Sequence, residues 1–256
     1  VRDDMSVTEE AVAAGKILER VNGDRDEAAR TLGWPLSKLN RRIALLNLTT
    51  EAMDALTERK ILVGHAELLA TIPQEKQGKA LYNIIDKNFS VQQVRDFLVN
   101  VSTDFKSAIF DTTGCGSCNF NSTVQSSLFN ETIGAADRCT NGDCYKAKTL
   151  AQVETIKSDL SEEVQTVMVL EVGDSGFTKL VVDGATGVGS EQYEACKLCS
   201  KLGATVSNIP GEIGKVEREI CFNADCNMKK VAERIKADKA VTKDGAGKTK
   251  SAGSAS

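Results

Sequence analysis

Eight cysteines fall into two sets of four that share one spacing. The first set is Cys115-x2-Cys118 followed, after twenty residues, by Cys139-x4-Cys144. The second set is Cys196-x2-Cys199 followed, after twenty-one residues, by Cys221-x4-Cys226. The segments that close the two sets are also alike, RCTNGDCYKAK against ICFNADCNMKK. The chain therefore contains an internal repeat built around its cysteines.

This spacing is typical of structural zinc sites. Zinc takes four ligands at tetrahedral corners, and a Cys-x2-Cys turn supplies two of them before a second pair returns about twenty residues later. We therefore predict two zinc ions for the eight cysteines. Because every ligand is a cysteine, no position stays open for water, so the predicted sites are structural. Disulfides and free buried thiols are alternatives that a cytoplasmic setting and the duplicated spacing disfavour. An iron–sulfur centre is a third alternative, although its cysteines are usually more closely spaced.

Catalytic chemistry is poorly supported by the remaining residues. His65 is the single histidine, so no Ser–His–Asp relay and no histidine-rich metal site can form without it. The segment Thr242–Thr249 resembles a phosphate-binding loop, but it has threonine in place of the first glycine and no preceding strand. We predict a protein that is not an enzyme and has no catalytic residues.

The net charge of −4 is unevenly spread over the 256 residues. Residues 1–100 are nearly balanced, 101–228 are acidic and 229–256 are basic. An acidic total argues against indiscriminate coating of nucleic acid, yet it allows a locally basic face. No apolar run has membrane-spanning length, and the start Val1-Arg2-Asp3-Asp4 is unlike a signal peptide. These features predict a cytoplasmic protein without a membrane partner.

Residues 1–100 carry the periodicity of short helices and almost no strand signal. Ser6 with Glu9 forms a potential capping box, and Ser90 with Gln93 opens another helix. Between them, a short helix over Asp26–Leu32, a Gly33-Trp34-Pro35 break and a second helix over Leu36–Leu46 have the length and punctuation of a helix-turn-helix.

The second helix of this motif has an apolar face and a cationic face. The apolar side chains expected to pack inward are Leu36, Leu39, Ile43 and Leu46. The polar side chains expected to contact DNA are Ser37, Lys38, Asn40, Arg41 and Arg42. Arginine and lysine suit guanine edges or phosphates, and asparagine suits adenine. A solvated basic helix face is the alternative interpretation.

Three ordered motifs resemble the central DNA-binding domain of the ParB partition proteins. They are DEAARTLGWPLSKLNRRIALLNLTTEAMDAL, then Gly64-His65-Ala66 within ILVGHAELLA, then Ser90-Val91-Gln92 within FSVQQVRDFL. With the cysteine repeat added, the chain is similar to the ParB-like proteins of the PRTRC plasmid system. The resemblance implies a homodimer that binds a palindromic, centromere-like site on double-stranded DNA in plasmid or chromosome partition, together with a ParA-like ATPase.

The sequence departs from this family at several points. Pro35 stands where the family usually has serine, and Ala44 stands where it usually has arginine. The Gly-Glu-Arg-Arg signature of the family's N-terminal nucleotide-binding domain is absent from this sequence, so we expect no nucleotide-gated sliding from it. A site-specific transcriptional regulator and a zinc-stabilised interaction adaptor are the alternative functions.

The expected architecture has four parts. Residues 1–100 form a ParB-like helix-turn-helix domain, 101–150 the first four-cysteine zinc module, 151–238 a strand pair with the second module, and 239–256 a disordered basic tail. The fold class is thus mainly α in the N-terminal half and α+β in the C-terminal half, with two zinc-ribbon or treble-clef-like modules. Strands are expected within 164–172 and 177–183, a hairpin around Pro210-Gly211, and helices starting near Cys144 and Cys226.

Overall fold

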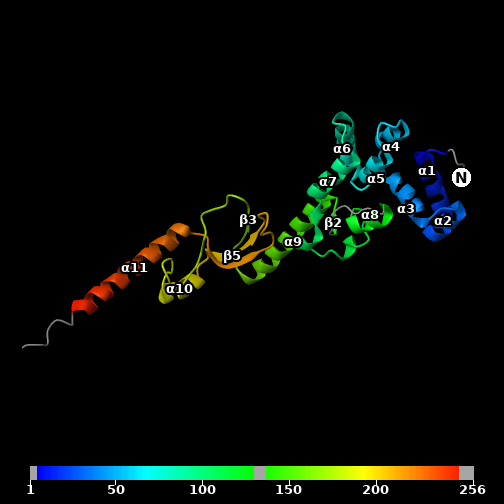
Figure 1. Cartoon of the computed structure of the whole chain (residues 1–256). Coiled ribbons are helices and arrows are strands. Elements are labelled where there is room, and N and C mark those ends of the chain that lie inside the picture. The colour runs from blue at the N-terminus through cyan, green and yellow to red at the C-terminus, as the bar shows by residue number, and fades with distance from the viewer. Residues whose placement is uncertain (1–4, 130–136, 248–256) are drawn as a thin grey trace, which may run out of the picture. The chain divides into compact units, whose positions relative to one another are not determined.

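The computed structural model, shown in Figure 1, describes residues 5–129 and 137–247. The chain divides into two compact units, one ending at Lys148 and the other beginning at Thr149. The helical segment and the first set of cysteines both belong to the first unit.

The N-terminal part of the first unit is entirely helical, as its periodicity predicts. Its helices are α1 (Val7–Arg20), α2 (Arg25–Leu32), α3 (Leu36–Ala44), α4 (Thr50–Thr57), α5 (Val63–Leu69), α6 (Gln74–Asp86) and α7 (Val91–Val101). A single 3₁₀ turn, Leu45–Asn47, separates α3 from α4.

Side-chain caps begin several of these helices. At α1 the Ser6 hydroxyl accepts the Glu9 backbone N–H at 3.2 Å, while the Glu9 carboxylate accepts the Ser6 N–H at 2.8 Å. Ser90 and Gln93 form the same reciprocal pair at α7. Both predicted capping boxes are therefore confirmed. These caps satisfy backbone N–H groups that lack partners within the helix.

Two apolar clusters hold the helices of this part together. The smaller one joins α1, α2 and α3 through Ala14, Ala28, Ala29 and the fully buried Leu39. The larger one is centred on residues such as Leu45 and Leu69.

Gln77 is a fully buried polar residue at the edge of the larger cluster. Its Nε2 donates to the carbonyls of Asn47 and Ile72, and its Oε1 accepts the N–H of Thr49 at 2.8 Å. This side chain therefore fixes the connection from α3 to α4 against α6.

The first four-cysteine module follows α7 within the same unit. Its elements are β1 (Thr103–Asp104), α8 (Ser122–Phe129), β2 (Arg138–Cys139) and the start of α9 (Gly142–Glu163). The strands β1 and β2 pair antiparallel. Part of the stretch between Cys118 and Cys139 is thus helical, and residues 130–136 lie outside the described residues.

The module is bound to the helical part by hydrogen bonds to backbone carbonyls. The Thr71 carbonyl accepts from Gln125 Nε2 at 2.9 Å and from Thr140 Oγ1 at 2.6 Å. Arg138 donates to the hydroxyl and the carbonyl of Ser102, at the end of α7. Gln125 and Ser102 are buried, so these bonds are shielded from water.

The second unit is built on a four-stranded sheet with the order β3-β5-β6-β4. Its elements are the end of α9, β3 (Val167–Leu170), β4 (Thr178–Lys179), α10 (Ser190–Lys197), β5 (Leu202–Ser207), β6 (Val216–Cys221) and α11 (Ala224–Gly247). Strand β3 runs parallel to β5, and the other neighbours are antiparallel.

The hairpin expected around Pro210-Gly211 is confirmed, because β5 and β6 pair directly across it and Gly211 has φ +89°. The strands expected within 164–172 and 177–183 are present but shorter. They do not form a pair with each other, because β5 and β6 lie between them in the sheet. The C-terminal half thus combines helices with strands, as the predicted α+β class requires.

The basic tail begins later than the sequence indicates. Residues 239–247 continue α11 instead of being disordered, since the charged stretch after residue 224 has no proline or glycine before Gly245. The rest of the expected tail, 248–256, lies outside the described residues. Within the described ranges, no helix is both long and apolar enough to cross a membrane.

Candidate DNA interface and cysteine clusters

The predicted helix-turn-helix is formed by α2, a tight turn and α3. Gly33 ends α2 in the left-handed conformation, with φ +66°, and its N–H bonds back to Ala29 and Arg30. Pro35 then begins α3 with φ −58°, and no side chain among the described residues caps this helix. Glycine and proline thus act here as the local sequence predicts.

The apolar face of α3 is narrower than predicted. Leu39 is fully buried and Ile43 is half-buried against the small cluster. Leu36 and Leu46 are 41% and 42% exposed, so neither is buried as expected, although Cδ1 of Leu46 lies against Gly15 of α1. Leu46 follows the end of α3 in the 3₁₀ turn, which rotates its side chain away from the helical register.

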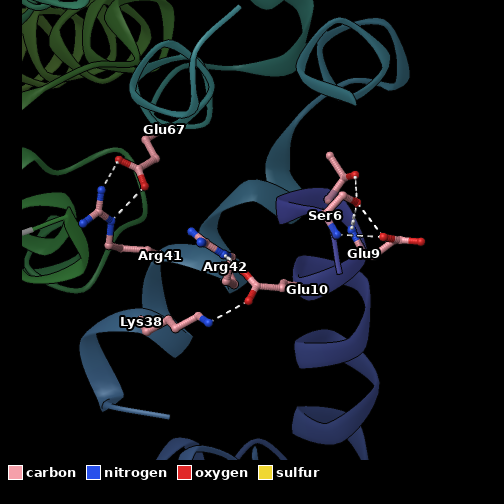
Figure 2. A network of polar contacts seen from close by, with 8 residues as sticks. Ser6, Glu9, Glu10, Lys38, Arg41, Arg42 and Glu67 are labelled. Atoms are coloured by element: carbon pink, nitrogen blue, oxygen red, sulfur yellow. Dashed lines mark hydrogen bonds and ion pairs between the residues drawn. The ribbon is translucent and has the colours of Figure 1, made fainter. Parts of the chain in front are cut away.

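Two cations of α3 share one carboxylate on α1 (Figure 2). The Glu10 carboxylate accepts from Lys38 Nζ at 2.6 Å and from Arg42 Nε at 2.7 Å. Burial alone raises the pKa of Glu10, but the hydrogen bonds from Lys38 and Arg42 outweigh it and the net pKa is lowered. The Lys38 ammonium also lies 4.3 Å from the centre of the Trp34 ring, a cation–π contact.

The third cation of α3 pairs with an acid on α5. Arg41 donates from Nε and Nη2 to the two carboxylate oxygens of Glu67, at 2.8 and 2.9 Å, as Figure 2 shows. Glu67 is only 9% exposed at its side chain, whereas Arg41 remains 40% exposed. This two-point ion pair fixes α3 against α5 and leaves part of the guanidinium open to solvent.

The five expected DNA-contacting residues therefore differ in accessibility. Lys38 retains 37% side-chain exposure, Arg42 only 15%, and Ser37 is exposed. The Asn40 side-chain oxygen accepts from Arg25 Nη1 at 2.7 Å. Arg42 is largely covered by α1, so it contributes mainly to the packing of the motif.

The acidic partners of these cations are not apparent from the sequence. Glu10 precedes Lys38 by 28 residues, and Glu67 follows Arg41 by 26 residues. Ion pairs between neighbouring turns of one helix have a recognisable spacing, but pairs between helices depend on tertiary packing. No pattern in the sequence distinguishes Glu10 or Glu67 from the other acidic residues.

The two remaining family-like motifs meet in the structure. A Cβ added to Gly64 would lie 3.0 Å from Cγ1 of Val91, so α5 and α7 approach closely at this glycine. At the start of α5, His65 Nδ1 accepts the N–H of Leu62 at 3.2 Å. Burial lowers the pKa of His65, which favours the neutral ring. His65 therefore serves the architecture of the helix start, as its motif predicts.

The first set of cysteines is gathered in one place. Burial raises the pKa of the Cys139 thiol, and the nearby Cys144, Cys118 and Cys115 raise it further by charge repulsion. Cys115 and Cys139 are buried, Cys118 is half-buried and Cys144 is exposed. These four cysteines are up to 29 positions apart in the sequence but are neighbours in space.

The second set is gathered in the same manner. Burial raises the pKa of Cys221, and repulsion from Cys196, Cys226 and Cys199 adds to this rise. All four side chains line one cavity of about 60 Å³. The eight cysteines all lie among the described residues, and each has a free thiol.

The thiols do not have the arrangement of a metal site as they stand. Across 5–129 and 137–247, no group of three or more histidine, cysteine, aspartate or glutamate side chains has positions suited to a bound metal ion. The zinc-ribbon or treble-clef character of the two modules stays a prediction.

Comparison with known proteins supports the predicted resemblance for the N-terminal part. Residues 3–103 match the family model of the ParB HTH domain. A nucleoid occlusion protein of Geobacillus sp. (strain WCH70) is 38% identical over 96 residues, which are 37% of this chain and 34% of that protein. The nucleoid occlusion protein of Oceanobacillus iheyensis is 32% identical over 102 residues, or 40% of this chain and 36% of the relative. The match thus spans about a third of these relatives.

Among solved structures, the DNA-binding domain of the chromosome-partitioning protein ParB complexed to the centromeric parS site is 26% identical. The match covers 36% of this chain and 75% of that one, with a TM-score of 0.33. The family match confirms the resemblance to ParB proteins for residues 3–103. The finer likeness to the PRTRC-system proteins stays a prediction.

Proposed function

We propose that this chain binds double-stranded DNA at specific sequences through α3, in the partition of plasmids or chromosomes. The observation that carries the proposal is the match of residues 3–103 to the ParB HTH domain. The cationic surface of α3 supports it, because this helix has three cations and no acid. The similarity to two nucleoid occlusion proteins also supports a function at chromosomal DNA.

The proposed contact surface consists of Ser37, Lys38, Asn40 and Arg41. Arg41 uses Nε and Nη2 on Glu67, and within the described residues Nη1 has no acceptor. A base edge or a phosphate can therefore take Nη1 without breaking the ion pair. The ion pair also holds the guanidinium in one orientation, which lowers the entropy lost on binding DNA.

Lys38 contacts DNA by leaving the Glu10 carboxylate for a DNA phosphate. Its bond to Glu10 is one of two that this carboxylate accepts, so Arg42 still neutralises Glu10 when Lys38 turns to a phosphate. Each cation that contacts phosphate releases counterions and adds to the salt dependence of binding. Pro35 and Ala44 offer no polar side-chain atom, so no DNA contact is assigned to either of these two family positions.

The proposed partners follow from the same resemblance. A palindromic, centromere-like site requires two copies of α3, so the protein acts as a homodimer on DNA. A ParA-like ATPase is the expected partner in partition. Nucleotide-gated sliding is not assigned to these residues.

An interaction adaptor is the second candidate function. It is favoured by the ion pairs that Lys38, Arg41 and Arg42 form with acids of the same chain. These pairs make the surface of α3 less positive than its three cations alone would make it. A transcriptional regulator would use the same helix as a partition protein, so the structure of α3 favours neither.

A genome-wide occupancy profile of the tagged protein in its own host separates these functions. Partition predicts one dominant cluster of inverted repeats, near genes for replication or a ParA-like ATPase. Sharp peaks scattered over promoters would contradict a role in partition and indicate a transcriptional regulator. An absence of enrichment at any site would contradict DNA binding and favour the adaptor.

A further inference from the structure

The duplication of the cysteine segments extends from the sequence to the hydrogen bonds. In the first module, the Cys139 thiol donates to the Asn141 carbonyl at 3.4 Å. The Asn141 side-chain oxygen in turn accepts the backbone N–H of Cys144 at 3.0 Å. The asparagine therefore links the two last cysteines of the set and caps the start of α9.

The second module repeats these bonds at the matching positions. The Cys221 thiol donates to the Asn223 carbonyl at 3.5 Å, and the Asn223 side chain accepts the N–H of Cys226 at 2.9 Å. Here the asparagine caps α11. Two modules that return their chains differently, through α8 in one and a β5–β6 hairpin in the other, thus present their last two cysteines alike.

The leading pairs are also built alike. The Cys118 N–H donates to the Cys115 carbonyl at 3.2 Å, and the Cys199 N–H donates to the Cys196 carbonyl at 3.0 Å. In the second pair, the N–H of Lys201 donates to Cys199 Sγ at 3.4 Å. A backbone N–H directed at sulfur stabilises a thiolate, the form in which cysteine binds metal.

A lysine occupies the same place in both modules, four residues after the last cysteine. Lys148 follows Cys144 by one helical turn of α9, and its Nζ donates to Cys115 Sγ at 3.5 Å. Lys230 follows Cys226 by one turn of α11 and lines the cavity with the four thiols. An ammonium group at this position offsets negative charge that gathers on the sulfurs.

We propose that each four-cysteine cluster binds one zinc ion, with Lys148 and Lys230 offsetting the charge of the two sites. Four thiolates and one Zn²⁺ carry a net charge of −2, which a neighbouring ammonium partly neutralises. On binding, the four thiols of a cluster give up their protons to water and the sulfurs move together to about 2.3 Å from the ion. Zinc remains divalent throughout, so no oxidant or reductant is needed.

The donor set of the clusters fits zinc better than the alternatives do. The thiols are free, so neither cluster is a pair of disulfides in the described structure. In each set, two sulfurs come from one tight turn, one from the end of a strand and one from a helix start, and four thiolates are a donor set that closed zinc sites use. The buried Asn227 beside the second cluster has a side-chain Nδ2 without a hydrogen-bond partner among the described residues.

Metal content of the full chain tests the zinc sites. The protein is purified under reducing conditions with zinc, and metal is measured by mass spectrometry together with the thiols that react with a colorimetric reagent. We expect two zinc ions per chain, and one ion in either Cys144→Ser or Cys226→Ser. A folded chain without metal and with eight reactive thiols would overturn the proposal, as would iron in place of zinc.

Cobalt substitution provides a readout that folding alone does not change. Four thiolates around Co²⁺ give an intense sulfur-to-metal charge-transfer absorption, which should reach saturation at two equivalents in the full chain and halve in each cysteine variant. Saturation at one equivalent, unaffected by Cys144→Ser, would overturn the first site. The same result with Cys226→Ser would overturn the second.

The lysines are tested against neighbours on the same helices. Lys148→Gln should weaken zinc binding about tenfold or more in competition with a chromophoric chelator, the size typical of groups that support metal ligands. Lys146→Gln on α9 removes the same charge without the contact to Cys115 and should leave zinc binding unchanged. Lys230→Gln and Lys229→Gln form the equivalent comparison on α11. Equal affinity within a pair would refute the role of that lysine.

Discussion

The ion pair between Arg41 and Glu67 should affect both the free energy of unfolding and the affinity for DNA, and the two effects can be measured separately. Arg41→Ala leaves the nearly buried Glu67 carboxylate without its two donors, whereas Glu67→Gln removes the charge and keeps the side-chain shape. Exposed ion pairs contribute about 0–1 kcal/mol, and breaking a buried pair costs about 3–5 kcal/mol. With one partner 9% and the other 40% exposed, the coupling should lie between these limits, at about 1–2 kcal/mol.

A double-mutant cycle measured by denaturant unfolding checks this value. The four proteins are the full chain, Arg41→Ala, Glu67→Gln and the double variant. The Arg30–Glu27 pair on α2 is a matched control, because its side chains are 72% and 50% exposed and its coupling should stay below about 0.5 kcal/mol. A coupling for Arg41 and Glu67 no larger than that of the control would refute the assignment of a stabilising pair.

DNA affinity separates the two roles of Arg41. Arg41→Ala should weaken binding by about 1–3 kcal/mol at sites where Arg41 reads a base, and by a uniform amount across sequences where it contacts phosphate. Glu67→Gln should change affinity less than Arg41→Ala does, because the guanidinium is kept and the loss of its fixed orientation is opposed by the loss of a negative charge beside it. Equal losses in both variants would contradict a direct contact from Arg41 to DNA.

Three further changes test other parts of the molecule. Lys38→Ala should reduce the salt dependence of DNA binding by about one released counterion, whereas Lys157→Ala, an equally exposed lysine on α9, should not. Because folding lowers the pKa of Glu10, its ionised carboxylate stabilises the fold at pH values above the unfolded pKa of about 4.3. That contribution is lost as pH falls through the folded pKa, so acid unfolding profiles of Glu10→Gln and the full chain should converge at low pH. Gln77→Ala should lower the free energy of unfolding by about 1–3 kcal/mol, because it leaves the half-buried N–H of Thr49 and a carbonyl partner unpaired. A loss below about 0.5 kcal/mol would contradict its role.

Local features of the fold follow directly from the sequence. Ser6, Gly33 and Ser90 act at helix ends through contacts within five residues, so the pattern of a single segment determines them. The same holds for the helices that begin beside Cys144 and Cys226. Short-range capping leaves a sequence signature because the backbone groups left unpaired at a helix end are satisfied by residues close to it in the sequence.

Long-range features do not follow in this way. Glu10 and Glu67 are close to α3 only after the helices pack, and the strand order β3-β5-β6-β4 places distant segments side by side. Leu46 has the right spacing for a buried residue, but it lies in the 3₁₀ turn after α3 and stays 42% exposed. The repeated cysteine spacing correctly indicates that each set gathers in space, while the bound ion stays a proposal.

The most direct test of DNA recognition by α3 is selection from a pool of random duplex DNA by the full chain. We expect enrichment of one inverted repeat, retained by Lys157→Ala and lost when Lys38 and Arg41 are both replaced by alanine. A pool that stays random after repeated rounds, at a salt concentration where the protein is folded and monodisperse, would contradict sequence-specific binding. Enrichment that survives the double replacement would show that another surface reads the DNA.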